Sequence, residues 1–387
     1  MPVSMFRSVL RSTVVFLCLA LGLGCTSRNL RRDYLHNYQS EREILVREGA
    51  LDTRLGVDAG VEPVDYATPI VSDDTVWIGS ETRGVEAFFK KSLRKRWSFA
   101  PKNGVSSELN LIEDGSQLIL LFGANDGYVY ALDADTGKTL WKYEVRVPVL
   151  AKVTVHADRV YISTTDDTVH CLERQTGKWL WHYRRSGDYI TTIHGNSSVV
   201  IDADRALVGF SDGYFVALNT RDGSVVWETK IHTGNKFTDV DASAYLGSQY
   251  IYIPSYDGDL YALARTTGKL VWHIEAGGAR QVTSEDGFLY VPSNLGFVAK
   301  VDAESGRIVW KFDLDDGTPT RVSVIGNRLV FGASKRYLYT INKGDGSFVD
   351  RYNIGHRSGF HSNLALDGNA FYTLSNYGTL YRFRLND

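Results

Sequence analysis

The side chains that most often carry out chemistry in proteins, histidine and cysteine, are scattered along this chain. It contains nine histidines and three cysteines, and neither a His-x-x-His nor a Cys-x-x-Cys pair occurs. Metal ions such as zinc are usually held by ligands at such short spacings, so no metal site is predicted. The recurrent Asp-Gly and Thr-Gly-Lys glycines are turn residues rather than a phosphate-binding loop. The sequence therefore predicts no catalytic residue, no metal and no cofactor.

One cysteine, Cys25, lies where it could be modified. Arg7 and Arg11 precede an apolar stretch of 12 residues, Thr13–Gly24, which is too short to cross a membrane as a helix and is typical of a signal-peptide core. The segment Leu-Gly-Leu-Gly-Cys25 resembles a bacterial lipobox, although a glycine stands where an aliphatic residue is usual. We therefore expect a lipoprotein signal peptide over residues 1–24 and a diacylated Cys25. An ordinary secretory signal with an incidental cysteine is the alternative.

The residues after Cys25 predict a destination and a tether. Thr26 follows the cysteine in place of an aspartate, which by resemblance to enterobacterial sorting rules favours the outer membrane. Residues 27–41 are polar and basic without an apolar period. We expect residues 25–41 to form a lipidated cysteine and a flexible tether, and ~15 such residues reach on the order of 20 Å.

A repeated sequence motif predicts the fold that would position any functional site. In its clearest copy, Asp126-Gly127 opens a run rich in aromatic and β-branched residues, a Thr-Gly-Lys turn follows, and Trp141 lies 14 residues after Gly127. Copies of about 40–45 residues with four short strand-like runs are typical of β-propeller blades. The eight copies end at Trp97, Trp141, Trp181, Trp227, Trp272, Trp310, Asp350 and the C-terminus. A tryptophan repeated once per blade is expected to pack between blades, and Asp350 in its place predicts a weaker seam at blade seven.

The two ends of the chain are predicted to close the ring. The last copy stops at Asp387 after its third strand, and Arg42–Glu48 is the only strand-like run before the first inner strand, Thr68–Val71. Pairing that run beside Leu380–Leu385 would remove two open sheet edges. We therefore expect an all-β, eight-bladed propeller with four antiparallel strands per blade, in one domain over residues 42–387. A seven-bladed ring that leaves out a weak end copy is the alternative.

Charge and cysteine usage narrow the possible functions. The 43 basic and 45 acidic residues nearly cancel, so no surface for nucleic acid is predicted. With Cys18 and Cys25 in the N-terminal segment, Cys171 is alone, and we expect it to be buried and apolar.

The basic cluster Lys90–Arg96 is expected on an outer edge, where charge blocks edge-to-edge pairing. Contact with anionic lipid head groups is the alternative.

The two longest connections between blades are consecutive. They follow Trp181 and Trp227 and contain residues 186–195 and 233–241. Such connectors emerge on one face, and loops on a rigid scaffold often carry binding residues. They are more apolar than loops require, at Tyr189, Ile190, Ile193 and Phe237. We expect a partner-binding patch here; the alternative is that these residues fold back and pack on the ring.

The lipobox, the short tether and the eight Asp-Gly…Thr-Gly-Lys…Trp copies together resemble the BamB-type lipoproteins of the outer-membrane β-barrel assembly machinery, whose repeats are of the pyrroloquinoline-quinone type. The resemblance covers the whole chain. It implies a non-catalytic scaffold, lipid-anchored on the periplasmic face of the outer membrane. It also implies binding to the POTRA region of a BamA-like insertase and to other subunits of the complex, in aid of barrel insertion.

The same resemblance implies site residues in the two long connectors. Family members carry Asp-Val-Asp before the fifth blade, which is Asp239-Val240-Asp241 here. They also carry Leu-x-Leu-Arg-Gly in the preceding connector, where this chain has Thr-Thr-Ile193-His194-Gly195, so that a histidine replaces an arginine able to donate two hydrogen bonds. The implied partner-binding residues are Ile193, His194, Gly195, Asp239 and Asp241. The two aspartates could instead close a turn.

Two other functional classes stay open. Quinone-dependent dehydrogenases share this repeat, but they resemble a longer propeller with an adjacent cysteine pair that stacks on the quinone. No such pair occurs in this chain, and its insertions are too short to enclose a cofactor. An adhesive or sensor propeller lipoprotein with another partner is the third class.

Overall fold

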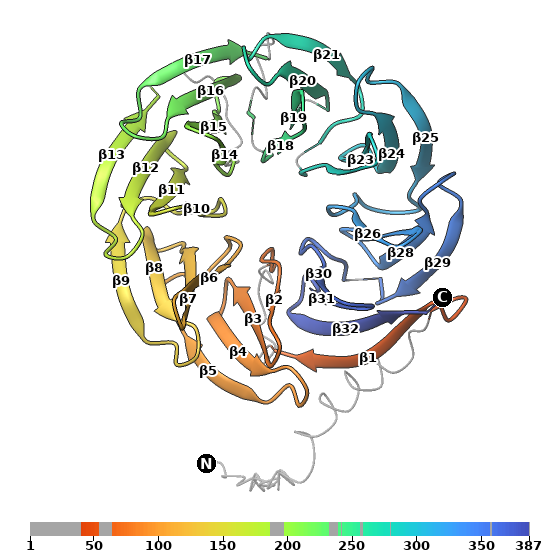
Figure 1. Ribbon diagram of the computed structural model, residues 1–387. Helices are drawn as coiled ribbons and strands as arrows, with labels where there is room; N and C mark the ends of the chain where they lie inside the picture. Colours follow the sequence, from red (N-terminus) through yellow and green to blue (C-terminus); the bar gives the residue numbers. More distant parts are fainter. Residues whose placement is uncertain are drawn as a thin grey trace, which may run out of the picture. The chain divides into compact units, whose positions relative to one another are not determined.

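A computed structural model describes residues 40–53, 64–185, 197–231, 239–240, 242–255, 258–278, 280–356 and 358–386. Residues Gln39–Asp387 form one compact unit. The described residues form eight four-stranded antiparallel sheets arranged as blades around a ring, which confirms the predicted eight-bladed propeller (Figure 1). Among them, no helix is long and apolar enough to cross a bilayer.

Blades one to four each use four consecutive strands, ordered from the centre outward. Blade one contains β2 (Ile70–Val71), β3 (Thr75–Ser80), β4 (Gly84–Phe89) and β5 (Lys95–Phe99). Blade two contains β6 (Asn110–Asp114), β7 (Gln117–Gly123), β8 (Tyr128–Asp133) and β9 (Thr139–Glu144). Blade three contains β10 (Thr154–His156), β11 (Arg159–Thr164), β12 (Thr168–Glu173) and β13 (Trp179–Arg184). Blade four contains β14 (Val200–Asp202), β15 (Arg205–Gly209), β16 (Tyr214–Asn219) and β17 (Val225–Lys230).

Blades five to seven repeat this order, and blade eight takes its outer strand from the other end of the chain. Blade five contains β18 (Tyr245–Leu246), β19 (Tyr250–Pro254), β20 (Leu260–Ala264) and β21 (Leu270–Ile274). Blade six contains β22 (Thr283–Glu285), β23 (Phe288–Ser293), β24 (Phe297–Asp302) and β25 (Ile308–Asp313). Blade seven contains β26 (Ser323–Ile325), β27 (Arg328–Gly332), β28 (Tyr337–Asn342) and β29 (Phe348–Asn353). Blade eight contains β30 (Ala365–Asp367), β31 (Ala370–Leu374), β32 (Thr379–Leu385) and β1 (Leu45–Asp52).

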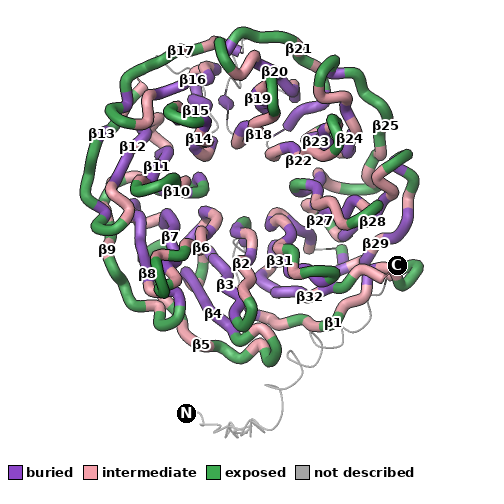
Figure 2. The backbone as a smooth tube through the Cα atoms, in the orientation of Figure 1, coloured by how far each residue is buried: buried purple, intermediate pink, exposed green. Residues whose placement is uncertain are grey.

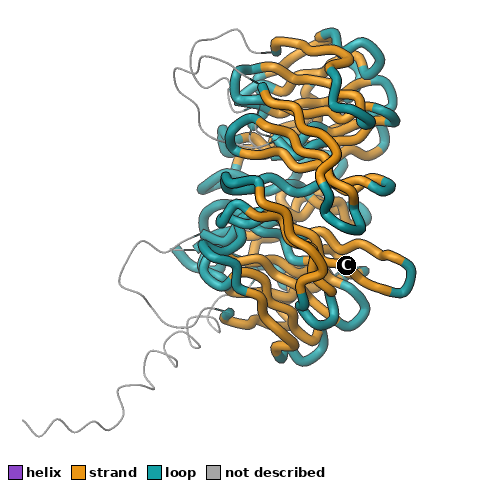
Figure 3. The backbone as a smooth tube through the Cα atoms, turned by 90° about the vertical axis from the view of Figure 1, so that its left-hand side faces the viewer, coloured by secondary structure: helices purple, strands orange, loops and turns teal. Residues whose placement is uncertain are grey.

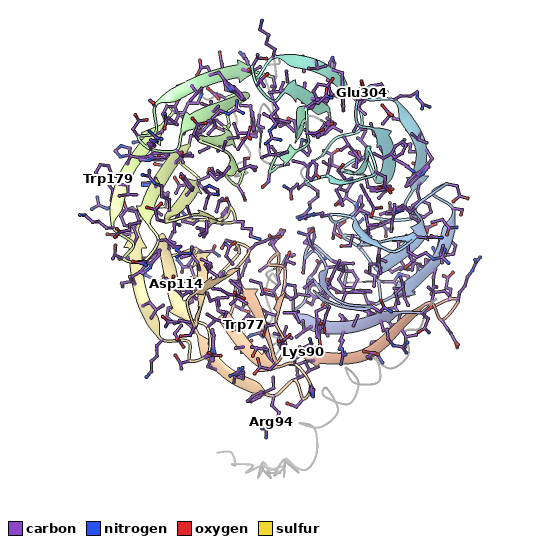
Figure 4. The ribbon with its side chains drawn as sticks, in the orientation of Figure 1. Trp77, Lys90, Arg94, Asp114, Trp179 and Glu304 are labelled. Atoms are coloured by element: carbon purple, nitrogen blue, oxygen red, sulfur yellow. The ribbon has the colours of Figure 1, made fainter. Side chains whose placement is uncertain are left out.

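The core lies between the blades rather than at the centre of the ring. The second and third strands of each blade are buried along most of their length because both faces of the sheet contact a neighbouring blade, as in β3, where all six residues are buried. Several outer strands instead alternate between exposed and half-buried residues along most of their length, as in β9, β17 and β25. Figure 2 shows this change from buried middle strands to an exposed rim. Trp179 of β13 points outward from that rim (Figure 4).

The ends of the chain close the ring as predicted. Strand β1 pairs antiparallel with β32, with Leu45 opposite Leu385 and Asp52 opposite Thr379. The strand begins at Leu45 rather than at the predicted Arg42, and a bulge between Arg47 and Gly49 shifts its register. The seven-bladed alternative is therefore wrong.

The recurrent tryptophan packs blades one to six against the blade that follows each of them. The ring of Trp97 lies against Gly137, where a Cβ atom would come within 2.6 Å of it. The Trp97 indole N–H donates to the Ala134 carbonyl at 3.0 Å. Equivalent indole hydrogen bonds run from Trp141 to Arg174, Trp181 to Thr220, Trp272 to Glu304 and Trp310 to Gly344. The Thr-Gly-Lys glycine is thus needed both for its positive φ, +71° at Gly137, and for the space that the indole fills.

Asp350 takes the tryptophan position of blade seven and is buried. Its carboxylate accepts hydrogen bonds from the backbone N–H groups of Arg42 at 3.1 Å, Ile44 at 2.9 Å and Leu45 at 3.0 Å, and from the Ser40 hydroxyl. The next outer strand, β1, starts at this point, so no Thr-Gly-Lys turn lies opposite for an indole to pack on. We call this contact of Asp350 with residues 40–45 the closing seam. The weaker seam expected from the sequence stays a prediction.

Two smaller expectations can be compared with the structure. Cys171 is buried and unpaired, and burial raises the pKa of its thiol to about 11. The basic cluster spans the turn between β4 and β5 and the start of the outer strand β5, and Figure 4 shows Arg94 at the rim and Lys90 further in. Lys90 lies 2.7 Å from Asp367, and Lys95 lies 2.5 Å from Glu86. Part of the cluster is therefore neutralised by carboxylates within the ring.

Candidate partner-binding face

The antiparallel order of the strands places two kinds of loop on one face of the ring. The turn between the second and third strands of a blade, which contains Asp-Gly, lies at the same end as the connector to the next blade. Backbone hydrogen bonds join the two: the N–H of Val145 donates to the Gly127 carbonyl, and the N–H of Leu314 to that of Gly296, both at 2.9 Å. We call this side the connector face. Figure 3 views the ring edge-on, with loops at both faces.

Most of the predicted site residues lie outside the described part of the chain. This holds for Cys25, Ile193, His194, Gly195 and Asp241. Asp239 is described, and only 1% of its surface is exposed. Its carbonyl accepts a hydrogen bond from the Ser255 hydroxyl at 3.4 Å. Its carboxylate is therefore not on the surface, and a role for it in binding stays a prediction.

Arg185 lies directly before the first long connector and is held between two blades. Its guanidinium donates to Asp212, and to Glu228 at 2.8 Å, and it lies 4.0 Å from the centre of the Tyr214 ring. Only 12% of the Arg185 side chain is exposed. Burial lowers the pKa of Arg185, but its hydrogen bonds to Asp212 and Glu228 outweigh burial and hold that pKa above the usual range. The start of the connector is therefore fixed to blade four by charge.

The second long connector is fixed to blade four at both ends. The N–H of Ile231 donates to the Gly213 carbonyl at 3.0 Å before the connector, and the N–H of Val240 donates to the Phe210 carbonyl at 3.2 Å after it. The Val240 side chain packs closely on Gly209, where an added Cβ would lie 2.4 Å from it. We call residues Phe210–Gly213 the blade-four turn.

The far end of the first connector contacts the region that follows the second. The N–H of Ser198 donates to the Ser243 hydroxyl at 3.2 Å. The blade-four turn also contacts blade three, because the N–H of Ser211 donates to the Asp167 carboxylate at 3.2 Å. Each of the four described ends of the two connectors is thus held by a polar contact, three of them with the blade-four turn and the fourth with Ser243.

Sequence reasoning missed Arg185, although a signal was present. The residues that take the same place in four other blades are apolar: Val145, Ile231, Leu314 and Ile354. An arginine among these equivalents is the departure from the repeat that could have singled out this position. Its partners, Asp212 and Glu228, could not be found from the repeat alone because they come from the next blade.

A shallow hollow of about 380 Å³ adjoins blades one to three on the same face. It is lined by Glu81, Ser106, Asn125, Pro148, Leu150 and Thr165. The hollow is lined by both polar and apolar side chains: the Ser106 hydroxyl donates to Glu81 at 2.8 Å, while Leu150 is exposed and apolar. Such a surface offers hydrogen bonds and apolar contact. In the part of the chain that the structure covers, no three His, Cys, Asp or Glu side chains gather to hold a metal ion.

Known proteins place this ring in a family. A family model described as outer membrane protein assembly factor BamB matches residues 81–260 and 256–387. The chain belongs to this family. The BamB protein of Shewanella oneidensis is 26% identical over 255 residues, which is 64% of this chain and 64% of that protein. That alignment thus spans less than two thirds of the Shewanella protein.

Other BamB relatives align over more of their length. The Xanthomonas campestris protein is 27% identical over 78% of this chain and 77% of its own, and the Burkholderia pseudomallei protein is 25% identical over 82% and 84%. Solved structures show the same fold. BamB from Moraxella catarrhalis has a TM-score of 0.72 at 22% identity and covers 88% of this chain and 99% of its own. A quinohemoprotein alcohol dehydrogenase from Comamonas testosteroni also has a TM-score of 0.72, at 14% identity, over 89% and 77%.

Proposed function

We propose that this protein is a non-catalytic scaffold lipoprotein of the outer-membrane β-barrel assembly complex. It binds the POTRA region of a BamA-like insertase and aids insertion of outer-membrane proteins. The match of the BamB family model over residues 81–387 carries the proposal. The dehydrogenase structure shares only the fold at 14% identity, and fold alone does not imply function.

The proposed arrangement uses both parts of the chain. Residues 1–24 are a signal peptide, and a lipid on Cys25 anchors a tether over residues 25–41 in the outer membrane, with the propeller facing the periplasm. Anchoring raises the local concentration of the ring near the insertase, and the rigid ring fixes the orientation of the bound partner. No nucleic acid takes part, because the chain has nearly balanced charge.

The proposed contact site is formed by Ile193, His194, Gly195, Asp239 and Asp241. Ile193 supplies an apolar anchor, and Asp241 meets basic groups or backbone N–H donors of the partner. Asp239 is buried, so we assign it the support of Asp241 two residues later. Support for this site comes from the fixed ends of both connectors, which lie on one face of the ring.

The first test is purification of the solubilised lipoprotein from its own membranes, with identification of the proteins that accompany it. An Asp241→Lys variant should lose a POTRA-containing barrel protein that the parent retains. Asp158→Lys is the matched control, because Asp158 is 84% exposed in the β10–β11 turn on the opposite face. That variant should retain the partner.

Each outcome of this test bears on a separate part of the proposal. If no POTRA-containing protein accompanies the parent even after mild cross-linking, the assembly role is wrong, and an adhesive or sensor propeller becomes the better account. If Asp241→Lys retains the partner, the role stands and the site is wrong. A quinone absorbance in the purified protein would favour the dehydrogenase class.

A further inference from the structure

We infer that the blade-four turn, with Arg185 bound to it, is a shared support for the described ends of both long connectors, and that Arg185 is a positioning residue for the proposed binding site. The inference rests on the proposed function for its purpose. Its structural basis lies entirely in described residues. It does not require Arg185 to touch the partner.

Arg185 is an exception to a rule that the other blades follow. In five blades, the residue after the outer strand donates its N–H to the carbonyl of the same blade's second turn, at 2.9–3.1 Å. These residues are Val145, Arg185, Ile231, Leu314 and Ile354. Because four of the five are apolar, the backbone contact does not need a charged side chain. The guanidinium of Arg185 therefore adds a contact with the next blade that the fold itself does not require.

The added contact crosses from blade three to blade four. Arg185 leaves β13 and reaches Asp212 in the blade-four turn and Glu228 on β17. Asp212 also accepts the N–H of Tyr214 at 3.2 Å, so the carboxylate is held by its own turn. A charge-assisted contact between two partly buried groups fixes geometry more strongly than an exposed pair. The last described residue before position 186 is thus tied to the neighbouring blade.

The same short turn holds the second connector. Its first and last residues, Phe210 and Gly213, accept hydrogen bonds from Val240 and Ile231, which lie at the two ends of that connector. Three of the four connector ends therefore contact one turn of four residues. The fourth end, at Ser198, contacts Ser243 beyond the second connector. A displacement of the turn would therefore disturb the anchored ends of both connectors.

The inference can be tested by hydrogen–deuterium exchange and by affinity for the purified POTRA region of the insertase from the same source. In Arg185→Leu, which installs the kind of residue found in the other blades, amide exchange should become faster in residues 186–196 and in residues 232–241. Affinity for the POTRA region should fall roughly tenfold, as for a coupling between neighbouring sites. Arg185→Lys, which keeps the charge, should recover part of both losses.

Arg174→Leu is the matched control. Arg174 pairs with Asp114 at 3.0 Å and also crosses between blades, but its backbone N–H donates to Asp158 on the opposite face. This variant loses an ion pair of the same kind, so it should leave exchange in the two connectors and POTRA affinity unchanged. A general loosening of the ring would affect both variants alike.

Several results would overturn the inference. Unchanged exchange in both segments of Arg185→Leu would do so, and exchange that changes only in residues 186–196 would refute a shared support. If Arg185→Leu fails to fold, Asp212→Asn decides, because it keeps the shape of the side chain but removes the charge that binds Arg185 to the blade-four turn, and it should give the same pattern. If the parent does not bind the POTRA region, the proposed function is wrong, while the exchange data still decide the positioning.

Discussion

Replacing Asp350 by alanine should open the ring at the closing seam. The carboxylate accepts three backbone N–H groups and a hydroxyl from residues 40–45, and the alanine would leave them without an acceptor. The N–H of Leu45 is fully buried, whereas those of Arg42 and Ile44 are partly accessible to water. A buried donor left unpaired costs about 1–3 kcal/mol, and a half-accessible one costs less. The sum is about 3 kcal/mol.

This loss should appear first as local opening of β1. Since 1.4 kcal/mol corresponds to a factor of ten, about 3 kcal/mol raises the open fraction of the seam by roughly 100-fold. Hydrogen–deuterium exchange of the amides in residues 44–52 measures this fraction directly. Asp313→Ala is the control, because Asp313 is largely exposed at the end of an outer strand, 3.8 Å from Lys311. It should leave exchange in β1 unchanged.

Two further variants of Asp350 test the reasoning. Asp350→Asn keeps the shape but turns an N–H₂ group toward backbone N–H donors, so exchange in β1 should lie between the parent and the alanine variant. Asp350→Trp restores the repeat's own residue but should not restore the seam, because no Thr-Gly-Lys turn lies opposite. If Asp350→Ala changes exchange in β1 less than threefold, or Asp350→Trp matches the parent, the carboxylate is not what holds the seam.

Three other perturbations follow from the same structure. Gly177→Ala should lower the free energy of unfolding by roughly 3 kcal/mol, because its Cβ would lie 2.5 Å from the Trp141 ring. Gly326→Ala is the control, since Gly326 also has a positive φ but lies in open space, and it should cost only about 1 kcal/mol. Equal urea midpoints for the two variants would contradict this. Burial raises the pKa of Glu108, but Lys152 and hydrogen bonds from Thr68 and Asn363 outweigh burial and hold that pKa below 4.5. The contribution of Glu108 to the free energy of unfolding is therefore complete above pH 4.5 and is lost as the pH falls through the lower pKa of the folded state. In urea unfolding, the stability of Glu108→Gln should depend less on pH in that acid range than the stability of the parent. The Cys171 thiol, with its pKa raised to about 11, should react with a thiol reagent at pH 8 only after unfolding when Cys18 and Cys25 are replaced by serine; rapid labelling of the folded protein would show that it is accessible.

The repeat predicted the fold well because each blade carries its own local pattern. The spacing from Gly127 to Trp141 indicates a strand, a turn and an outer strand that packs on the next blade, and the structure confirms each of these. The missing outer strand of the last copy was enough to predict pairing with the N-terminal segment. Only the start and register of β1 differed, because the bulge after Arg47 cannot be read from an alternation of side chains.

The contacts between blades were much harder to predict. Asp350 looks like a lost tryptophan in the sequence, yet its carboxylate binds residues that lie 305 to 310 positions away. Arg185 finds its two carboxylates on a neighbouring blade, and Asp239, predicted from a family motif, is buried. Such roles depend on how loops of different blades meet. A pattern that repeats within one blade does not contain that information.

The way the ring closes also fixes an order of events during folding. Strand β1 is the most N-terminal strand described, but its partner β32 is the most C-terminal, so β1 must stay unpaired until nearly the whole chain has been synthesised. Pairings between such distant segments form slowly and leave an open edge exposed meanwhile. A truncation that removes only β32 should therefore leave seven complete blades and two unpaired strand edges, at β1 and β31.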